Sequence, residues 1–278
     1  MCAMGHHVAM ERIDLGHNRR TSQDRRARAR SGECIALLAA IERGQIEILF
    51  QPQFAAGSGA LIGGEALTRW HHPEQVLVGG AALFDAAEQT GLVGRLSRHV
   101  ASEALAAAAG WRDDLRLSLN VTASDLAEAG FTDTIASLVA GAGFPPQRLT
   151  LEITEQALVA DLERSAVRLG QLADLGMRIA LDDFGAGFCN FGYLKRLPLH
   201  YLKLDRSMVE GIDENPRDLA VLRGILSMAL ALGLEVIAEG IERESQREAA
   251  AREGCTAWQG FLGAPPMTAR EFGRLTVR

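Results

Sequence analysis

The sequence predicts an α/β fold, a modified TIM-type (β/α)₈ barrel whose first strand runs antiparallel to the others. Three observations lead to this prediction. The chain has 278 residues, which is enough for one large barrel. Eight short strand-like runs alternate with helical stretches rich in alanine and leucine. Only Ala-Ala-Gly-Ser-Gly-Ala separates the first two runs, which suits a hairpin and is too short for a helical crossover.

The predicted elements begin with an amphipathic helix over residues 34–44, which Gly44 closes. The eight predicted strands cover residues 46–54, 61–70, 115–121, 148–154, 177–183, 201–205, 234–240 and 257–263. Helical stretches between them include residues 96–111 and 218–233. Because the order beyond the hairpin is strand, helix, strand, helix, these later strands are expected to be parallel.

Residues 1–33 differ from the rest because they have little apolar periodicity and many arginines. We predict that they form a basic linker or tail, and a basic helix that docks on a partner is the alternative. Residues 34–278 are then expected to form one globular domain.

The composition narrows the class of protein. Hydrophobic residues make up 47% and charged residues 23% of the chain, as in globular proteins. The four cysteines have no Cys-x-x-Cys spacing, which argues against a zinc cluster or a disulfide framework and for a reducing, cytoplasmic location. No apolar run has membrane-spanning length, and no signal peptide is expected. The net charge of −6 provides no basic surface for duplex nucleic acid.

Polar residues stand near the end of almost every predicted strand. They are Glu65, Asn120, Glu152, Asp182, Asp183, Lys203, Glu239 and Gln259. One acid at a strand end is usually solvated or caps the next helix. In an α/β barrel, however, the carboxyl ends of the strands converge on one face, where active sites lie. The sequence therefore predicts that these side chains share one pocket.

Five carboxylates in one pocket cannot all remain charged unless cations accompany them. Oxygen ligands select hard ions such as Mg²⁺, Mn²⁺ or Ca²⁺. The number of carboxylates suggests two ions, with Asp182 in the middle as the bridging ligand. Two such ions are a standard device for in-line displacement at phosphorus, so we expect phosphoester chemistry.

Nine motifs along the chain carry a family resemblance. They are FQPQF, EALTRWHHP, AEQTGLV, SLNVTASDL, LEITE, ALDDFGAG, YLKLDRSMV, VIAEGIE and WQGFLGAP. In this order they resemble the EAL domain family, the bacterial phosphodiesterases of cyclic di-GMP, from residue 34 to about residue 270. The resemblance implies that the protein hydrolyses cyclic di-GMP to linear pGpG. The alternative is a non-catalytic receptor domain for cyclic di-GMP.

The resemblance also implies roles for the strand-end residues. The ligands of a first metal would be Glu65, Asn120, Glu152 and Asp182, and those of a second would be Asp182, Asp183 and Glu239. Lys203 would hold the attacking water or help to deprotonate it, with Glu239 as a candidate base. Gln259 would complete the shell of the water and metals and contact the substrate. The expected ions are two Mg²⁺ or Mn²⁺, and Ca²⁺ is expected to inhibit because it prefers longer bonds and more ligands.

Three further residues receive roles. The resemblance implies that Gln51 contacts substrate from the first strand. Arg69 lies four residues beyond Glu65 on one predicted strand, so both are expected on the same face, where Arg69 would hold a substrate phosphate. Glu155 matches the glutamate with which the family braces the loop after Asp183. Its alternative role is that of an acid at a helix N-terminus.

The chain departs from the family pattern in that loop. The family commonly reads Asp-Asp-Phe-Gly-Thr-Gly-Tyr-Ser-Ser, whereas this chain reads Asp-Asp-Phe-Gly-Ala-Gly-Phe-Cys-Asn over residues 182–190. The loop couples dimer contacts to metal binding in the family, so the lost hydroxyl groups bear on regulation more than on chemistry. A homodimer is implied, through residues 190–197 and the segment around Pro216. An upstream sensory or GGDEF domain is an implied partner.

Overall fold

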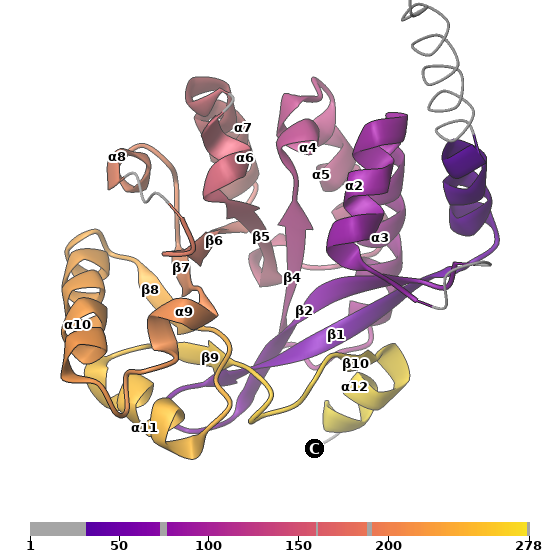
Figure 1. The fold of residues 1–278 in the computed structure, drawn as a ribbon. Helices are drawn as coiled ribbons and strands as arrows, with labels where there is room; N and C mark the ends of the chain where they lie inside the picture. Colours follow the sequence, from indigo (N-terminus) through magenta and orange to yellow (C-terminus); the bar gives the residue numbers. More distant parts are fainter. Residues whose placement is uncertain (1–31, 73–76, 160, 188–190, 277–278) are drawn as a thin grey trace, which may run out of the picture.

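The computed structural model describes residues 32–72, 77–159, 161–187 and 191–276. They form a closed barrel with helices around it (Figure 1). Hydrogen-bonded neighbours around the barrel follow the order β1, β9, β8, β7, β6, β5, β4, β2, and β2 pairs with β1 to close the ring. The predicted (β/α)₈ barrel is confirmed.

The eight barrel strands are β1 Ile46–Ala55, β2 Leu61–Trp70, β4 Arg116–Val121, β5 Leu149–Thr154, β6 Arg178–Phe184, β7 Tyr201–Leu204, β8 Glu235–Ala238 and β9 Ala257–Gln259. The largest difference from the prediction is at the last strand, which ends at Gln259, and the chain bends at Gly260, whose backbone lies against that of Ile241. Two strands of two residues each, β3 Val78–Gly79 and β10 Met267–Thr268, extend the sheet beside β2 and β1. Both are too short to produce a periodic signal in the sequence.

A helix over residues 32–42 precedes the barrel. The helices that follow are α2 Gly80–Thr90, α3 Val93–Ala108, α4 Ala123–Ala127, α5 Phe131–Gly141, α6 Glu155–Val159, α7 Leu162–Asp174, α8 Phe191–Leu194, α9 Arg206–Val209, α10 Pro216–Ala231, α11 Glu244–Glu253 and α12 Ala269–Leu275. Among the described residues, no helix has both the length and the apolar character needed to span a membrane.

Strand β1 is antiparallel to both of its barrel neighbours, β2 and β9. The cause is the short hairpin, because a five-residue connection such as 56–60 can only reverse the chain. The remaining neighbouring pairs, from β2–β4 around to β8–β9, are parallel. Their carboxyl ends therefore lie at one end of the barrel.

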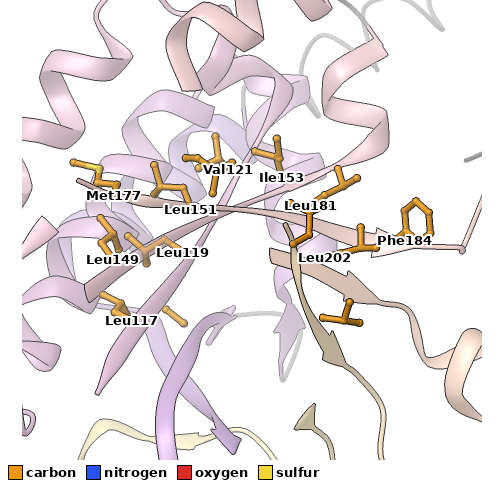
Figure 2. Close-up of a cluster of buried hydrophobic side chains, with 14 of the residues drawn as sticks. Leu117, Leu119, Val121, Leu149, Leu151, Ile153, Met177, Leu181, Phe184 and Leu202 are labelled. Atoms are coloured by element: carbon orange, nitrogen blue, oxygen red, sulfur yellow. The ribbon is translucent and has the colours of Figure 1, made fainter. Parts of the chain in front are cut away.

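Alternation along the strands separates an apolar layer from a polar barrel interior. Leu117, Leu119 and Val121 of β4 belong to one buried cluster with Leu149, Leu151 and Ile153 of β5 (Figure 2). The residues between them, Ser118, Asn120, Thr150 and Glu152, must point to the opposite face of the sheet. The apolar cluster thus joins the strands to the helices, and the barrel interior receives the polar side chains.

The helix over residues 32–42 packs on the barrel exterior. Its Leu37 and Ala40 are fully buried in a second apolar cluster, with Trp70 of β2 and Leu83 of α2. The start of the predicted domain at residue 34 falls inside this helix, and residues 1–31 of the predicted basic tail lie outside the described residues. The tail remains a prediction.

Candidate active site

A cavity of about 350 Å³ opens at the end of the barrel where the parallel strands terminate. Its lining comes from β1, β2 and the ends of β6, β7, β8 and β9, and consists of Gln51, Glu65, Leu67, Asp182, Asp183, Lys203, Asp205, Arg206, Glu239, Gly240, Glu242, Gln259, Gly260 and Phe261. Most of the strand-end residues singled out from the sequence therefore meet in one place.

Lys203 of β7 lies at the centre of the acidic cluster and is fully buried. Its Nζ lies 2.6 Å from Glu152 Oε2, 2.9 Å from Asp182 Oδ1, 2.9 Å from Glu239 Oε1 and 3.5 Å from Glu65 Oε2. Leu202 and Leu204 on either side point away into the apolar cluster. The barrel interior thus holds a lysine whose charge is compensated by four carboxylates from four other strands or strand ends.

Burial and mutual repulsion disfavour the ionised forms of Glu152 and Glu239 in this cluster. The pKa of Glu152 is raised to about 8, mainly by burial and also by repulsion from Glu65 and Asp182, while Lys203 opposes the rise. Burial also raises the pKa of Glu239 well above its usual range. Burial lowers the pKa of Lys203, but the surrounding carboxylates outweigh it and bring its pKa well above the ordinary value. One ammonium group is therefore too little positive charge for the cluster.

A bulge places two adjacent aspartates at the same cavity. Leu181 and Phe184 of β6 pair with Leu202 and Leu204 of β7, so two aspartates on β6 oppose the single residue Lys203 on β7. Asp183 has φ +53°, the only positive value outside glycine among the described residues. An ordinary strand would turn Asp182 and Asp183 to opposite faces, and the bulge lets both line the cavity.

Side-chain amides hold Glu65 from two sides. Asn120 Nδ2 donates to Glu65 Oε1 at 2.8 Å, and Gln259 Nε2 donates to Glu65 Oε2 at 2.8 Å. Gln259 Nε2 also donates to Gln51 Oε1 at 3.0 Å. Glu65 is 6% exposed, so its carboxylate has one defined position within the barrel.

The carboxylates form two groups whose geometry fits hard cations. One oxygen each from Glu65, Glu152 and Asp182 lies within 4.8 Å of the others, and the same holds for Asp182, Asp183 and Glu239. Asp182 belongs to both groups. Glu152 Oε1 is buried without a hydrogen-bond partner among the described residues, although it is an acceptor. An all-oxygen donor set with an unpaired buried acceptor and excess negative charge suits Mg²⁺ or Mn²⁺.

Four predicted site residues are not part of the lining of this cavity. Asn120 and Glu152 contact the lining residues Glu65 and Lys203, respectively, and the other two are Arg69 and Glu155. Arg69 is half-buried on β2, beyond the described lining of the cavity, and its Nη1 donates to the carbonyl oxygen of Thr68 at 3.0 Å. Glu155 is half-buried as the first residue of α6, which packs against β6. Residues 188–190 of the loop that it was predicted to brace lie outside the described residues. The substrate role of Arg69 and the bracing role of Glu155 stay predictions.

Sequence reasoning missed several residues of the site. Leu67, Asp205, Arg206, Glu242 and Phe261 line the cavity. Leu67 lies two residues after Glu65, so strand alternation could have identified it. The other four follow β7, β8 and β9, in connecting segments or, for Arg206, at the first position of the four-residue helix α9, where no periodic pattern shows which way a side chain points.

Comparison with known proteins decides the family. The model of the EAL domain family matches residues 35–266. This chain belongs to the EAL domain family. Within the described residues, the EAL domain accounts for nearly all of the barrel and its helices.

Relatives of this EAL domain include two proteins of Pseudomonas aeruginosa. The bifunctional diguanylate cyclase/cyclic di-GMP phosphodiesterase MucR is 36% identical over 239 residues, which cover 84% of this chain and 35% of MucR. The cyclic di-GMP phosphodiesterase NbdA is 34% identical over 235 residues, which cover 83% of this chain and 30% of NbdA. The chain thus spans about a third of the length of these relatives.

Solved structures agree with this assignment. The PaMucR phosphodiesterase in complex with c-di-GMP superposes on this EAL domain with a TM-score of 0.80 at 35% identity, covering 87% of this chain and 99% of that one. The EAL enzyme Bd1971, in a form with cAMP and cyclic di-GMP bound, has a TM-score of 0.84 at 27% identity, covering 95% of this chain and 74% of that one. The predicted family and barrel are both confirmed.

Proposed function

We propose that this EAL domain is a metal-dependent phosphodiesterase that hydrolyses cyclic di-GMP to linear pGpG. The observation that carries the proposal is the convergence of five carboxylates in two groups that share Asp182, four of which pair with Lys203. Such a cluster is costly without function, because each carboxylate gains little from its neighbours and loses hydration. The relatives named as phosphodiesterases support the substrate.

The ligand sets that we propose follow the two carboxylate groups. Glu65, Glu152 and Asp182, with Asn120 beside Glu65, would hold one Mg²⁺ or Mn²⁺. A second ion would be held by Asp182, Asp183 and Glu239. Bound ions of this kind neutralise the scissile phosphate and lower the pKa of a coordinated water.

Lys203 is the proposed partner of the attacking water. Because its pKa lies well above the usual value, its ammonium group remains protonated and acts as a hydrogen-bond donor. It can therefore orient a water but cannot accept its proton at neutral pH. Glu239, whose carboxylate lies 2.9 Å from Lys203 Nζ at the cavity wall, is the residue that we propose as proton acceptor.

Substrate contacts are proposed for Gln51 and Gln259, which line the cavity, and for Arg69, which lies on β2 outside its lining. A guanidinium group suits a phosphate because it donates two parallel hydrogen bonds. Arg69 would have to leave the carbonyl oxygen of Thr68 to do so.

The test of the proposal is direct. The protein is mixed with cyclic di-GMP and Mg²⁺, and the products are separated by chromatography, with EDTA as the control. Production of pGpG that stops in EDTA is the expected result. Tight binding of cyclic di-GMP without any pGpG would instead identify the domain as a receptor.

The choice of ion gives a further prediction. Turnover is expected with Mg²⁺ or Mn²⁺ and inhibition with Ca²⁺, because Ca²⁺ takes more ligands at longer distances and positions the water poorly. Initial rates measured with each ion alone, and with Ca²⁺ added to Mg²⁺, test this. Equal turnover in Ca²⁺ would contradict the proposed role of the ions.

We also propose a homodimer through residues 190–197 and the segment around Pro216. Residue 190 lies outside the described residues, but α10 begins at Pro216 and exposes 52% of Val221. Val221→Asp is expected to convert the dimer to a monomer at micromolar concentration, as measured by light scattering. Val167→Asp on α7, where the valine is 62% exposed, is the matched control. A wild-type monomer with full activity would contradict the proposal.

Domain organisation remains a proposal as well. We propose that residues 1–33 are a basic linker to an upstream sensory or GGDEF domain or partner. The long relatives, of which this chain spans about a third, support the presence of other domains in such proteins.

A further inference from the structure

The side-chain amide of Gln53 is buried below the cavity, and none of the roles proposed above involves it. Gln53 lies two residues after Gln51 on β1, so both side chains face the barrel interior. Gln53 is 5% exposed and stands opposite Gln259 of β9 in the strand register. Its Nε2 donates to Gln259 Oε1 at 3.0 Å. Gln53 is not part of the described cavity lining, and its hydrogen bond to Gln259 connects it to the site.

The amide of Gln259 is fully engaged. A primary amide offers two N–H donors and one carbonyl acceptor. Both donors are used, by Glu65 Oε2 at 2.8 Å and Gln51 Oε1 at 3.0 Å, while the carbonyl accepts from Gln53. Glu65 accepts from one end of this amide and Gln53 donates to the other, so the chain of hydrogen bonds runs from Gln53 through Gln259 to Gln51.

We propose that Gln53 is a positioning residue that, together with Glu65, fixes the orientation of the Gln259 amide, and thereby the polarity with which Gln51 faces the substrate. This inference rests on the proposed function. With Oε1 of Gln51 accepting from Gln259, the Nε2 hydrogens are what Gln51 presents to the cavity. Donors suit the phosphate oxygens of a cyclic dinucleotide, whereas a reversed amide would present a carbonyl oxygen and repel them.

Three substitutions at Gln53 separate hydrogen-bond direction from packing. Methionine keeps the length and removes the donor. Lysine only donates, and glutamate only accepts. A glutamate would draw the N–H groups of Gln259 toward itself, so that the carbonyl oxygen of Gln259 would face Glu65. The expected order of substrate affinity is therefore wild type close to Gln53→Lys, then Gln53→Met, then Gln53→Glu.

The control is a second residue of the same environment. Gln53 and Thr150 both line a small cavity of about 40 Å³ toward the opposite end of the barrel, and Thr150 is 3% exposed. Thr150→Val keeps the shape and removes a polar group that does not contact Gln259 in the described hydrogen bonds. It is expected to leave kcat and KM within about twofold of wild type.

The measurements are kcat and KM for cyclic di-GMP at saturating Mn²⁺, with the melting temperature of each variant. Gln53→Met is expected to raise KM about tenfold, because the hydrogen bond to Gln259 is lost. Gln53→Glu is expected to raise KM about 100-fold, because the direction of that hydrogen bond is reversed. The kcat value of Gln53→Met should stay within about threefold, because the proposed metal ligands are unchanged.

Several results would overturn the inference. Equal losses in Gln53→Lys and Gln53→Glu would show that buried charge, not hydrogen-bond direction, matters. A loss in Thr150→Val as large as that in Gln53→Met would indicate a packing effect. A wild type that binds cyclic di-GMP but makes no pGpG would contradict the proposed hydrolysis. The role of Gln53 would then be tested by calorimetry, in which the affinities of the variants for cyclic di-GMP should follow the same order. A wild type that does neither overturns both.

Discussion

Replacing Glu65 with alanine is expected to lower the rate of cyclic di-GMP hydrolysis to background, a loss on the order of 10³-fold. Removal of a group that stabilises the transition state in a buried site has effects of this size. Glu65 contributes to the first carboxylate group and is held by Asn120 and Gln259 on either side. Its loss removes one proposed ion ligand and releases both amides. The measurement is pGpG formation at saturating Mg²⁺, with circular dichroism to show that the fold is kept.

Two further variants sharpen this test. Glu65→Gln keeps the volume and an acceptor for Asn120 but removes the charge, so it should be nearly as inactive as the alanine variant. Glu42→Ala removes an exposed glutamate that pairs with Arg95 at 3.0 Å, far in the sequence from the cluster, and should retain wild-type activity. Near-wild-type turnover of Glu65→Ala with Mg²⁺ would show that Glu65 does not hold an ion.

Replacing Lys203 with alanine is expected to reduce kcat by on the order of 10²-fold even at saturating metal, if its ammonium group orients the attacking water. The same change leaves four neighbouring carboxylates without their shared cation. Breaking a buried ion pair in this way lowers the free energy of unfolding by about 3–5 kcal/mol, so the melting temperature in EDTA should fall. Added Mn²⁺ should restore it, because the ion replaces the missing positive charge.

A titration with Mn²⁺ separates the two roles of Lys203. A role in charge balance alone would shift the Mn²⁺ dependence, and kcat would recover at high metal concentration. A role in orienting water leaves kcat low when the metal sites are saturated. Full recovery of kcat would therefore contradict the catalytic role.

Much of the barrel was predictable because its strands and helices have strong local patterns. Strand β2 was predicted with its observed bounds, and β1, β4, β5 and β6 to within one residue at each end. The short connection between the first two strands predicted that the first strand is antiparallel, as it is. The two-residue strands β3 and β10 were missed, since they exist only where β2 and β1 extend beyond the barrel and offer free edges.

The sequence predicted which residues form the site better than it predicted how they are arranged. Alternation showed that Lys203 faces the interior, and the strand ends identified most of the acids that now surround it. Alternation also placed Arg69 on the same face as Glu65, but the cavity described here does not reach it. The pattern could indicate a face of the strand, but not how far along the strand the cavity extends.

The sequence by itself determined which side chains point into the barrel, because a strand alternates with a period of two residues and a helix follows its apolar face. Only the tertiary structure decided how those side chains meet. The bulge that turns both Asp182 and Asp183 to one cavity depends on pairing with β7. The direction of the amide chain from Gln53 to Gln51 depends on the register between β1 and β9. Both features depend on strands that are distant in the chain. The backbone pairing and the buried hydrogen bonds that stabilise them form only when these strands come together, so no local segment of the sequence contains them.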